Sequence, residues 1–345
     1  MPPPAPARTT RLLFPPDPLA NVPFPAAKVG LYLTPYEVEI TPRLVLAYSA
    51  GLGAGGAAFL DDAGPDGLCA LPFQCVSPEW PVVLSMRQLL GDSLSVEEAR
   101  RGVHAVQDSR FHRPMRPGDR LVVTGQLVSA SKIRSGVLAT CKLVTSDRET
   151  GAAVTTTWTR SIYRNVALIG DPTQIEVPPP GEPDWTPGPK AEAVTIPIPR
   201  EMPHVYSECA NIWNPIHTER RQALAAGLPD IILHGTATWA LACLTLLRRY
   251  GSSKSLNRLT GRFSGIVIPG DPITICHEAI GAGEVRFEVR TASCGRSRGR
   301  ARGERDGSGG RGGYKEAAPD AVSHAVPFIG DFQGTASSRF APAAT

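Results

Sequence analysis

Long hydrophobic runs, paired cysteines and aromatic residues are all scarce in this chain of 345 residues. No window reaches the roughly 18 apolar residues that a membrane helix needs, which argues against a membrane-spanning helical protein. Aromatic residues make up 6% and the net charge is only +4, so we expect no nucleic-acid partner. The seven cysteines include no Cys-x-x-Cys pair and no zinc-site spacing. We therefore expect reduced thiols, no metal and a cytoplasmic protein, with a peroxisomal or mitochondrial location left open.

Proline, by contrast, is plentiful, and its clusters divide the chain. Residues 1–28 are predicted to form a disordered or extended Pro-rich arm, because helices tolerate proline poorly. A second Pro-rich stretch, 171–192, is typical of an extended linker. It separates two units of similar kind, 29–170 and 193–292. The remainder, 293–345, is predicted to be an Arg/Gly-rich loop and tail.

The two units share an internal repeat. Arg110-Phe111 is followed after five residues by Pro117-Gly118-Asp119. Arg262-Phe263 is followed in the same way by Pro269-Gly270-Asp271, and each residue lies 152 positions after its counterpart. A Pro-Gly-Asp turn alone is common, but two elements kept in one register indicate a true repeat. A period of this length predicts a duplicated domain and not a solenoid.

Hydrophobic periodicity gives both units the same order of elements, a strand, then helices, then several strands. Segments 136–144 and 153–163 are predicted to form a hairpin around a turn at 147–151. This order is typical of an α+β fold in which an antiparallel sheet wraps a helix. The strands are expected over 36–40, 120–125, 136–144, 153–163, 194–198, 273–276 and 284–291, and the helices over 42–53, 202–210, 218–227 and 231–247.

The second unit departs from the first after its last predicted strand, 284–291. The partner strand should follow, but residues 294–313 are rich in Arg and Gly and have no apolar alternation. We interpret this segment as a disordered surface loop, with an RNA-binding tail or an altered reading frame as alternatives. Residues 321–329 are the candidate for the missing strand.

The segment with the strongest catalytic candidate is Asn214-Pro215-Ile216-His217. Proline fixes its own φ and favours an extended conformation for the residue before it, so His217 projects from a defined turn. A second segment, Leu233-His234-Gly235-Thr236, precedes the long apolar run at 231–247 and places small residues at the start of a buried helix. A base beside the N-terminus of a helix suits chemistry at a carbonyl group.

These two segments, in this order, resemble the Asn-Pro-x-His core of the hydratase 2 motif and the helix start of the MaoC-like dehydratases. The duplication, with the motif in the second unit alone, resembles the double hot-dog form of eukaryotic members. The resemblance implies a tandem hot-dog fold, with an antiparallel sheet wrapped around a central helix in each half. It also implies a hydro-lyase that acts on a 3-hydroxyacyl or enoyl thioester, carried by CoA or acyl carrier protein, without a cofactor, as in fatty acid or polyketide biosynthesis.

Residue roles follow from the same resemblance. His217 would be the general acid and base, Asn214 its structural partner, and the Gly235 N–H a donor to the thioester carbonyl. Substrate-binding roles fall to His234, Thr236 and Trp213. From the residues alone, packing or hydrogen bonding is the favoured role for His234, and a place in the core is favoured for Trp213. The first half lacks the motif and is expected to be non-catalytic.

One position departs from the family motif. The family has an Asp two residues before the Asn, where this chain has Ile212, which cannot ionise. Asn211, Glu208 and Glu219 are the polar residues near it in sequence. The departure leaves three functions open: a hydro-lyase, a thioester isomerase, and a non-catalytic protein that binds or scaffolds acyl thioesters. A homodimer is also left open, since a double hot-dog chain is a pseudo-dimer by itself.

Overall fold

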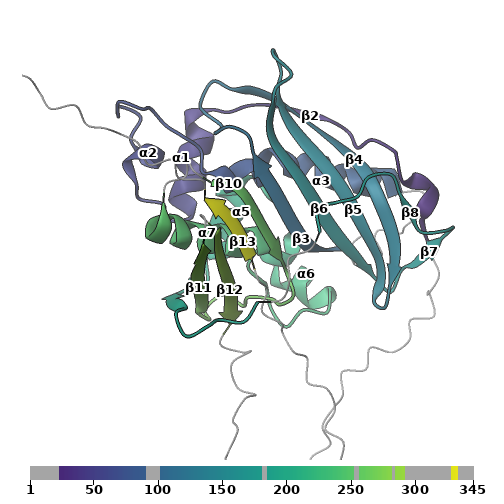
Figure 1. Cartoon of the computed structure of the whole chain (residues 1–345). Coiled ribbons are helices and arrows are strands. Elements are labelled where there is room, and N and C mark those ends of the chain that lie inside the picture. Colours follow the sequence, from purple (N-terminus) through teal and green to yellow (C-terminus); the bar gives the residue numbers. More distant parts are fainter. Residues whose placement is uncertain are drawn as a thin grey trace, which may run out of the picture.

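The computed structural model describes residues 23–90, 102–180, 185–251, 256–281, 284–291 and 328–332, the last through its backbone only. Two antiparallel halves lie side by side and share one continuous sheet (Figure 1). Its path is β2-β4-β5-β6-β3-β10-β13-β12-β11-β9, and β8 pairs with β4. Within the described part of the chain, every helix is too short or too polar to cross a membrane.

In the first half a long sheet covers the central helix α3, as the α+β prediction requires. The hairpin is confirmed, since β5 and β6 pair antiparallel around the turn at 147–151. Helix α3 begins after a short 3₁₀ turn, 72–75, and lies behind the strands in Figure 1. The elements are β2 (Tyr36–Glu39), α1 (Pro42–Gly51), α2 (Ala57–Leu60), α3 (Val76–Leu90), β3 (Gly102–Phe111), β4 (Arg120–Ile133), β5 (Gly136–Asp147), β6 (Ala153–Arg164), β7 (Ala167–Ile169) and β8 (Thr173–Gln174).

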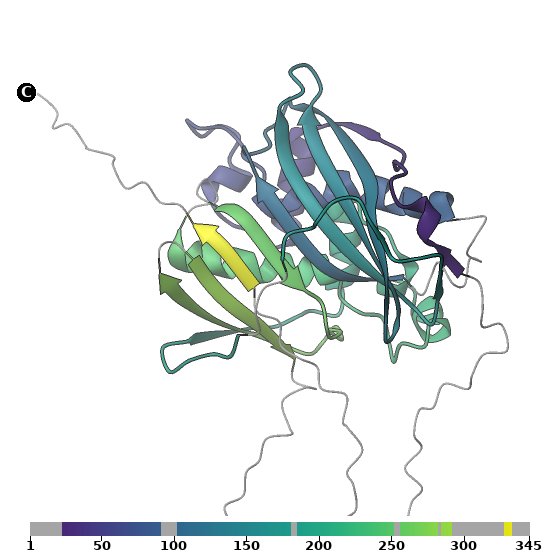
Figure 2. The same ribbon diagram turned by 45° about the vertical axis from the view of Figure 1, so that its right-hand side comes forward.

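The second half repeats this arrangement around α7, which lies behind the yellow-green strands in Figure 2. Ten of the sixteen residues of α7 are buried, so this helix forms the core that its apolar sequence predicted. The elements are β9 (Glu192–Ile196), α5 (Met202–Ala210), α6 (Arg220–Ala225), α7 (Gly235–Tyr250), β10 (Leu256–Arg262), β11 (Ile273–Gly281), β12 (Glu284–Thr291) and β13 (Phe328–Phe332). The molecule is therefore a double hot-dog.

The seam between the halves confirms the repeat. Strands β3 and β10 pair antiparallel, and Thr260 lies opposite Asp108. These two residues are also 152 positions apart, the offset of the repeat, so the pseudo-twofold axis passes between them. Across the same seam Arg258 binds both carboxylate oxygens of the buried Asp108, at 3.0 and 2.8 Å. A bidentate, partly buried pair of this kind fixes the register of the two halves.

A second contact between the halves joins helices α1 and α5. The Tyr48 and Tyr206 hydroxyls lie 3.4 Å apart, and both rings are almost completely buried. The Tyr48 hydroxyl also donates to the Phe73 carbonyl at 3.1 Å, just ahead of α3. The two tyrosines thus place the start of the first central helix close to the segment that carries His217.

Regular secondary structure begins inside the segment that was predicted to be a Pro-rich arm. Residues Pro23–Pro25 form β1, which pairs parallel with β7, and Ala26–Lys28 form a 3₁₀ turn. The cause is Phe24, which is fully buried and contacts the Tyr163 ring at a centroid distance of 5.2 Å. A short edge strand tolerates the prolines that exclude a helix. The boundary at residue 28 was therefore wrong, and residues 1–22 lie outside the described part.

The strand missing from the second half comes from far along the chain. Strand β13 inserts between β10 and β12 and pairs antiparallel with both. The candidate segment 321–329 overlaps it only at its last two residues, so the strand begins later than predicted. It also lies inside the segment 293–345 that was predicted as loop and tail. The Arg/Gly stretch 294–313 lies outside the described residues.

Helix α3 carries a buried carboxyl group, Glu79, that faces strands β3 and β6. Glu79 is 2% exposed and accepts hydrogen bonds from the Thr157 hydroxyl at 2.6 Å and the Gln107 amide at 3.2 Å. Burial raises the pKa of Glu79 to about 7, although these hydrogen bonds act in the opposite direction. The protonated carboxyl therefore suits this site better than the ionised one.

This burial predicts a pH-dependent stability. A carboxyl with a raised pKa in the folded state stabilises the fold fully below its ordinary pKa and loses that contribution as pH rises through about 7. We therefore expect Glu79→Gln to become more stable relative to wild type by about 2 kcal/mol between pH 5 and pH 8. Urea unfolding at both pH values measures this difference. Glu149→Gln, which removes an exposed carboxylate, should show no such change, and an equal response of both variants would contradict the account.

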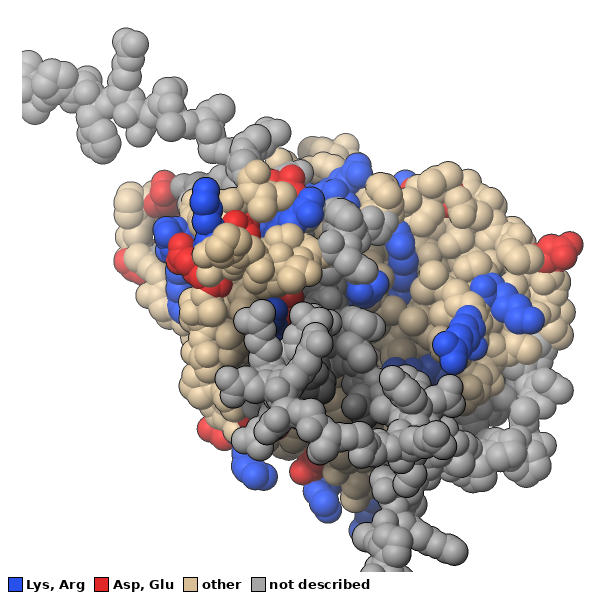
Figure 3. Space-filling view, turned by 60° about the horizontal axis from the view of Figure 1, so that its bottom comes forward, with Lys and Arg blue, Asp and Glu red and all other residues tan. Residues whose placement is uncertain are grey.

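Charges are mixed on the described surface visible in Figure 3. Acidic and basic side chains are interspersed on its left, and uncharged surface separates the basic side chains on its right. The described residues form no continuous basic stripe on this face.

Candidate active site

The segment that carries His217 begins where helix α5 ends. Asn211 is the C-cap and has a left-handed backbone with φ of 55°, a conformation that Asn tolerates better than most residues. The turn returns the Ile212 amide to the Ser207 carbonyl at 3.0 Å. It also sends the Ile212 side chain into the core, where it is 4% exposed. The position of the family carboxylate is therefore filled by packed hydrocarbon.

The Asn-Pro step then sets the direction of His217. Asn214 has an extended backbone, with φ of −143° and ψ of 122°, as predicted for a residue before proline. Pro215 starts a single 3₁₀ turn, Pro215–His217, and the His217 amide closes it on the Asn214 carbonyl at 3.0 Å. Asn214 thus contributes through its backbone conformation, which holds the imidazole on a rigid turn.

The His217 ring is held in one tautomer. Its Nδ1 lies 2.8 Å from the Ile232 carbonyl oxygen, which can only accept, so Nδ1 carries the proton. The neutral ring therefore keeps a bare Nε2. Burial lowers the pKa of His217 to about 4, against the opposing effect of the Ile232 carbonyl. His217 is accordingly an uncharged base at neutral pH.

This lowered pKa predicts the acid limb of the rate profile. A base that must be neutral loses activity only when it is protonated, so kcat/KM should stay constant from about pH 8 to pH 6 and fall below about pH 5. Rates measured across this range, with circular dichroism to confirm that the fold persists, test the expectation. If the rate instead falls with a midpoint between pH 6 and 7, His217 is not buried as described.

His234 lies directly against His217. The two ring centroids are 3.6 Å apart with an angle of 24° between the planes, which is a stacked pair. His234 is 2% exposed and its ring also contacts Tyr206, at 5.0 Å between centroids. The stacking was not expected from the sequence. The two residues are 17 positions apart, and no local sequence pattern links them.

Helix α7 starts immediately beside this pair. Gly235 is its first residue, so its N–H is one of the four that have no acceptor inside the helix. A Cβ at Gly235 would lie 3.1 Å from the Phe263 ring, tighter than ordinary contact. Glycine therefore lets Phe263 pack over the helix start, and the positive end of the helix dipole lies next to the imidazole pair.

The first half has no equivalent donor. The Leu233 amide bonds the Val267 carbonyl at 2.9 Å, and the Ala70 amide bonds the Met115 carbonyl at 3.0 Å. Val267 lies 152 residues after Met115, so these two bonds are counterparts. Two residues further along, Pro72 stands where the second half has Gly235. Proline has no N–H, so the first half lacks both the base and the donor.

The structure places the remaining predicted site residues in different surroundings. Thr236 lies close enough to the Tyr206 hydroxyl to lower the pKa of that group, against the larger effect of burial. Trp213 is 48% exposed, so the interpretation of this residue as core is wrong, because the chain turns it outward on the side opposite Ile212. The three polar residues near Ile212 in sequence, Glu208, Asn211 and Glu219, are all exposed at the surface. None of them fills the place of the family Asp.

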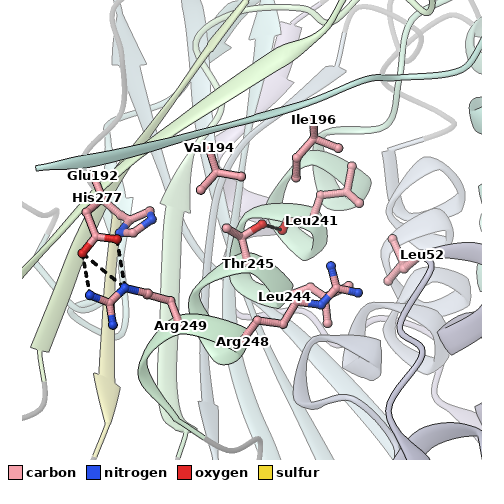
Figure 4. Close-up of a pocket in the computed structure, with 10 residues that line it drawn as sticks. All are labelled: Leu52, Glu192, Val194, Ile196, Leu241, Leu244, Thr245, Arg248, Arg249 and His277. Atoms are coloured by element: carbon pink, nitrogen blue, oxygen red, sulfur yellow. Dashed lines mark hydrogen bonds and ion pairs between the residues drawn. The ribbon is translucent and has the colours of Figure 1, made fainter.

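The groove in Figure 4 lies elsewhere on α7. It has a volume of about 390 Å³ and is lined by the C-terminal half of the helix, from Leu241 to Arg249, and by the edge strand β9. Arg249 on its rim binds the Glu192 carboxylate, at 2.7 Å in the shortest contact. Since Gly235 is at the other end of the helix, this groove is separate from the imidazole site. In the described ranges no three His, Cys, Asp or Glu side chains gather as a metal site requires.

Comparisons with known proteins agree with this geometry. Residues 186–294 match the family model of the MaoC like domain, and residues 27–156 match that of the FAS1-like, dehydratase domain region. Residues 186–294 form a MaoC-like dehydratase domain. The first model covers the imidazole pair and all of α7, and the second covers most of the first half. The model of the MaoC like domain thus matches the half that holds His217 and Gly235.

Individual relatives of this MaoC-like dehydratase point the same way. It is 27% identical to "Enoyl-CoA hydratase ChsH3" of Mycobacterium tuberculosis over 72% of this chain and 86% of that protein. It is 25% identical to "3-hydroxyacyl-thioester dehydratase Y" of the same organism, over 71% and 84% of the two chains. The MaoC-like dehydratase from Phytophthora capsici shares its fold, with a TM-score of 0.66, 16% identity and coverage of 88% and 96%. The protein is a hydro-lyase enzyme.

Proposed function

We propose that this MaoC-like dehydratase interconverts 2-enoyl thioesters and 3-hydroxyacyl thioesters at one site in its second half, with His217 as the acid and base. The observation that carries the proposal is the tautomer of His217, because a bare Nε2 beside a helix N-terminus supplies both groups that the reaction needs. The names of the two relatives, an enoyl-CoA hydratase and a 3-hydroxyacyl-thioester dehydratase, describe the same pair of substrates.

A single base can account for every proton that moves in the reaction. In hydration, His217 Nε2 takes a proton from water as the oxygen bonds to C3 of the enoyl group. The C2–C3 π electrons move toward the thioester carbonyl, whose developing negative charge the Gly235 N–H and the helix dipole stabilise. The imidazolium then returns its proton to C2, and His217 is neutral again. Dehydration runs through the same steps in reverse.

A substrate panel tests this proposal. Purified full-length protein is mixed with 2-enoyl-CoA and 3-hydroxyacyl-CoA thioesters of increasing chain length, and with the same acyl groups on acyl carrier protein. We expect turnover on at least one carrier, and faster turnover on acyl carrier protein would support the hypothesis of a biosynthetic role. Binding of the thioesters without any turnover would instead favour the non-catalytic alternative. Movement of the double bond without exchange of water would favour an isomerase.

A further inference from the structure

The missing carboxylate leaves an open question about how the reacting water is held. In the family motif, Asp and His together position that water, but Ile212 offers only buried hydrocarbon. The charged side chains nearest in sequence, Glu208 and Glu219, are exposed. A second acceptor must therefore come from another part of the site, and the ring stacked on His217 is the group in contact with it.

Hydrogen bonds assign the tautomer of that second ring. His234 Nε2 lies 3.3 Å from the Ile212 carbonyl oxygen, which can only accept. It also lies 3.2 Å from the Ser207 hydroxyl oxygen, whose own proton is donated to the Pro203 carbonyl at 2.9 Å. Both partners thus accept, so Nε2 carries the proton and Nδ1 is bare. The residue that replaces the family Asp holds His234 through its backbone.

The bare nitrogen of His234 has no partner within the protein. Among the described residues, Nδ1 is a buried polar atom without a hydrogen bond, in a side chain that is 2% exposed. Burial, and the neighbouring His217, lower the pKa of His234 to about 2, so the ring stays neutral and Nδ1 stays an acceptor. Buried acceptors in native proteins are satisfied as a rule, which points to a donor that arrives with the substrate.

We infer that His234 Nδ1 is the second acceptor of the active site and takes the place of the family carboxylate. This inference rests on the proposed function. The reacting water donates one hydrogen to His217 Nε2 and the other to His234 Nδ1, which directs an oxygen lone pair at C3. The proton that moves passes through His217 alone, as described above. His234 keeps its hydrogen bond to the oxygen, which in the product is the 3-hydroxyl group.

Two substitutions separate the functions of the two ring nitrogens. In His234→Gln the amide can reach the Nε2 position and donate to the Ile212 carbonyl, but no acceptor remains at the Nδ1 position. In His234→Asn the amide oxygen can occupy the Nδ1 position, but the donor to Ile212 is lost. We expect His234→Gln to lower kcat for crotonyl-CoA hydration about 100-fold with little change in KM. His234→Asn should stay within about tenfold of wild type.

A purely structural role predicts the opposite order. If His234 only packs and bonds Ile212, the Gln variant retains activity and the Asn variant loses more of it. Ser207→Ala serves as a control, because it removes one hydrogen-bond acceptor of His234 Nε2 and leaves Nδ1 unchanged. Urea unfolding of each variant separates misfolding from loss of catalysis. Wild-type activity in His234→Gln, or a larger loss in Asn than in Gln, overturns the inference. If the wild-type protein itself is inert, it is the proposed function that fails.

Discussion

Replacing His217 with Asn is expected to lower kcat/KM for hydration of crotonyl-CoA about a thousandfold, the effect usual for loss of a general base. The amide nitrogen of Asn can take the position of Nδ1 and still donate to the Ile232 carbonyl, which Nδ1 meets at 2.8 Å. The variant therefore keeps the hydrogen bond that holds the turn and loses Nε2 alone. Steady-state rates, with unfolding curves recorded in parallel, measure the effect.

A control in the first half makes this prediction specific. His112 is exposed and hydrogen-bonds Thr156 on the outer surface of the sheet. His112→Ala should leave the rate unchanged, because the first half contributes no base. Full activity in His217→Asn, or an equal loss in the two variants, would show that the chemistry does not depend on His217 Nε2.

Replacing Gly235 with Pro is expected to lower kcat at least 100-fold, because it removes the N–H that we propose as the donor to the thioester oxygen. Proline is well accepted at the first position of a helix, and Pro72 occupies the matching position in the first half. The helix should therefore form, and the loss should fall on kcat because the oxyanion develops only in the transition state.

Gly235→Ala separates the donor from the steric effect of a side chain. Alanine keeps the N–H and adds a Cβ that would lie 3.1 Å from the Phe263 ring. A small shift of that ring can accommodate it, so we expect a loss of about tenfold or less, well short of the proline variant. Similar losses in the two variants would mean that crowding by Phe263, and not the N–H, explains the effect.

Local patterns predicted most of the fold correctly. The alternation in 136–144 and 153–163 identified the hairpin, and the apolar run at 231–247 identified the buried helix, which begins at Gly235. The repeat offset also agrees with the pairing of Thr260 and Asp108 at the seam. These features are encoded within a few residues or in one register, so that a single chain reveals them.

Features that depend on distant segments could not be predicted. The missing strand was expected at 321–329, but β13 begins only at Phe328, because nothing in its short sequence marks which residues pair with β10 and β12. Likewise the stacking of His234 on His217 depends on how α5, the Asn-Pro turn and α7 meet in space. Ile212 was recognised as a departure from the motif, but only the structure places its carbonyl against His234.

The reversibility of the reaction tests the central claim most directly. Wild-type protein is incubated separately with crotonyl-CoA and with 3-hydroxybutyryl-CoA, and each mixture is followed by chromatography until it stops changing. A hydro-lyase must bring both mixtures to the same equilibrium ratio of enoyl to hydroxyacyl thioester, because the same steps run in both directions. That common ratio is the result we predict. If neither thioester changes, and longer acyl chains on either carrier are equally inert, the site described at His217 does not catalyse hydration.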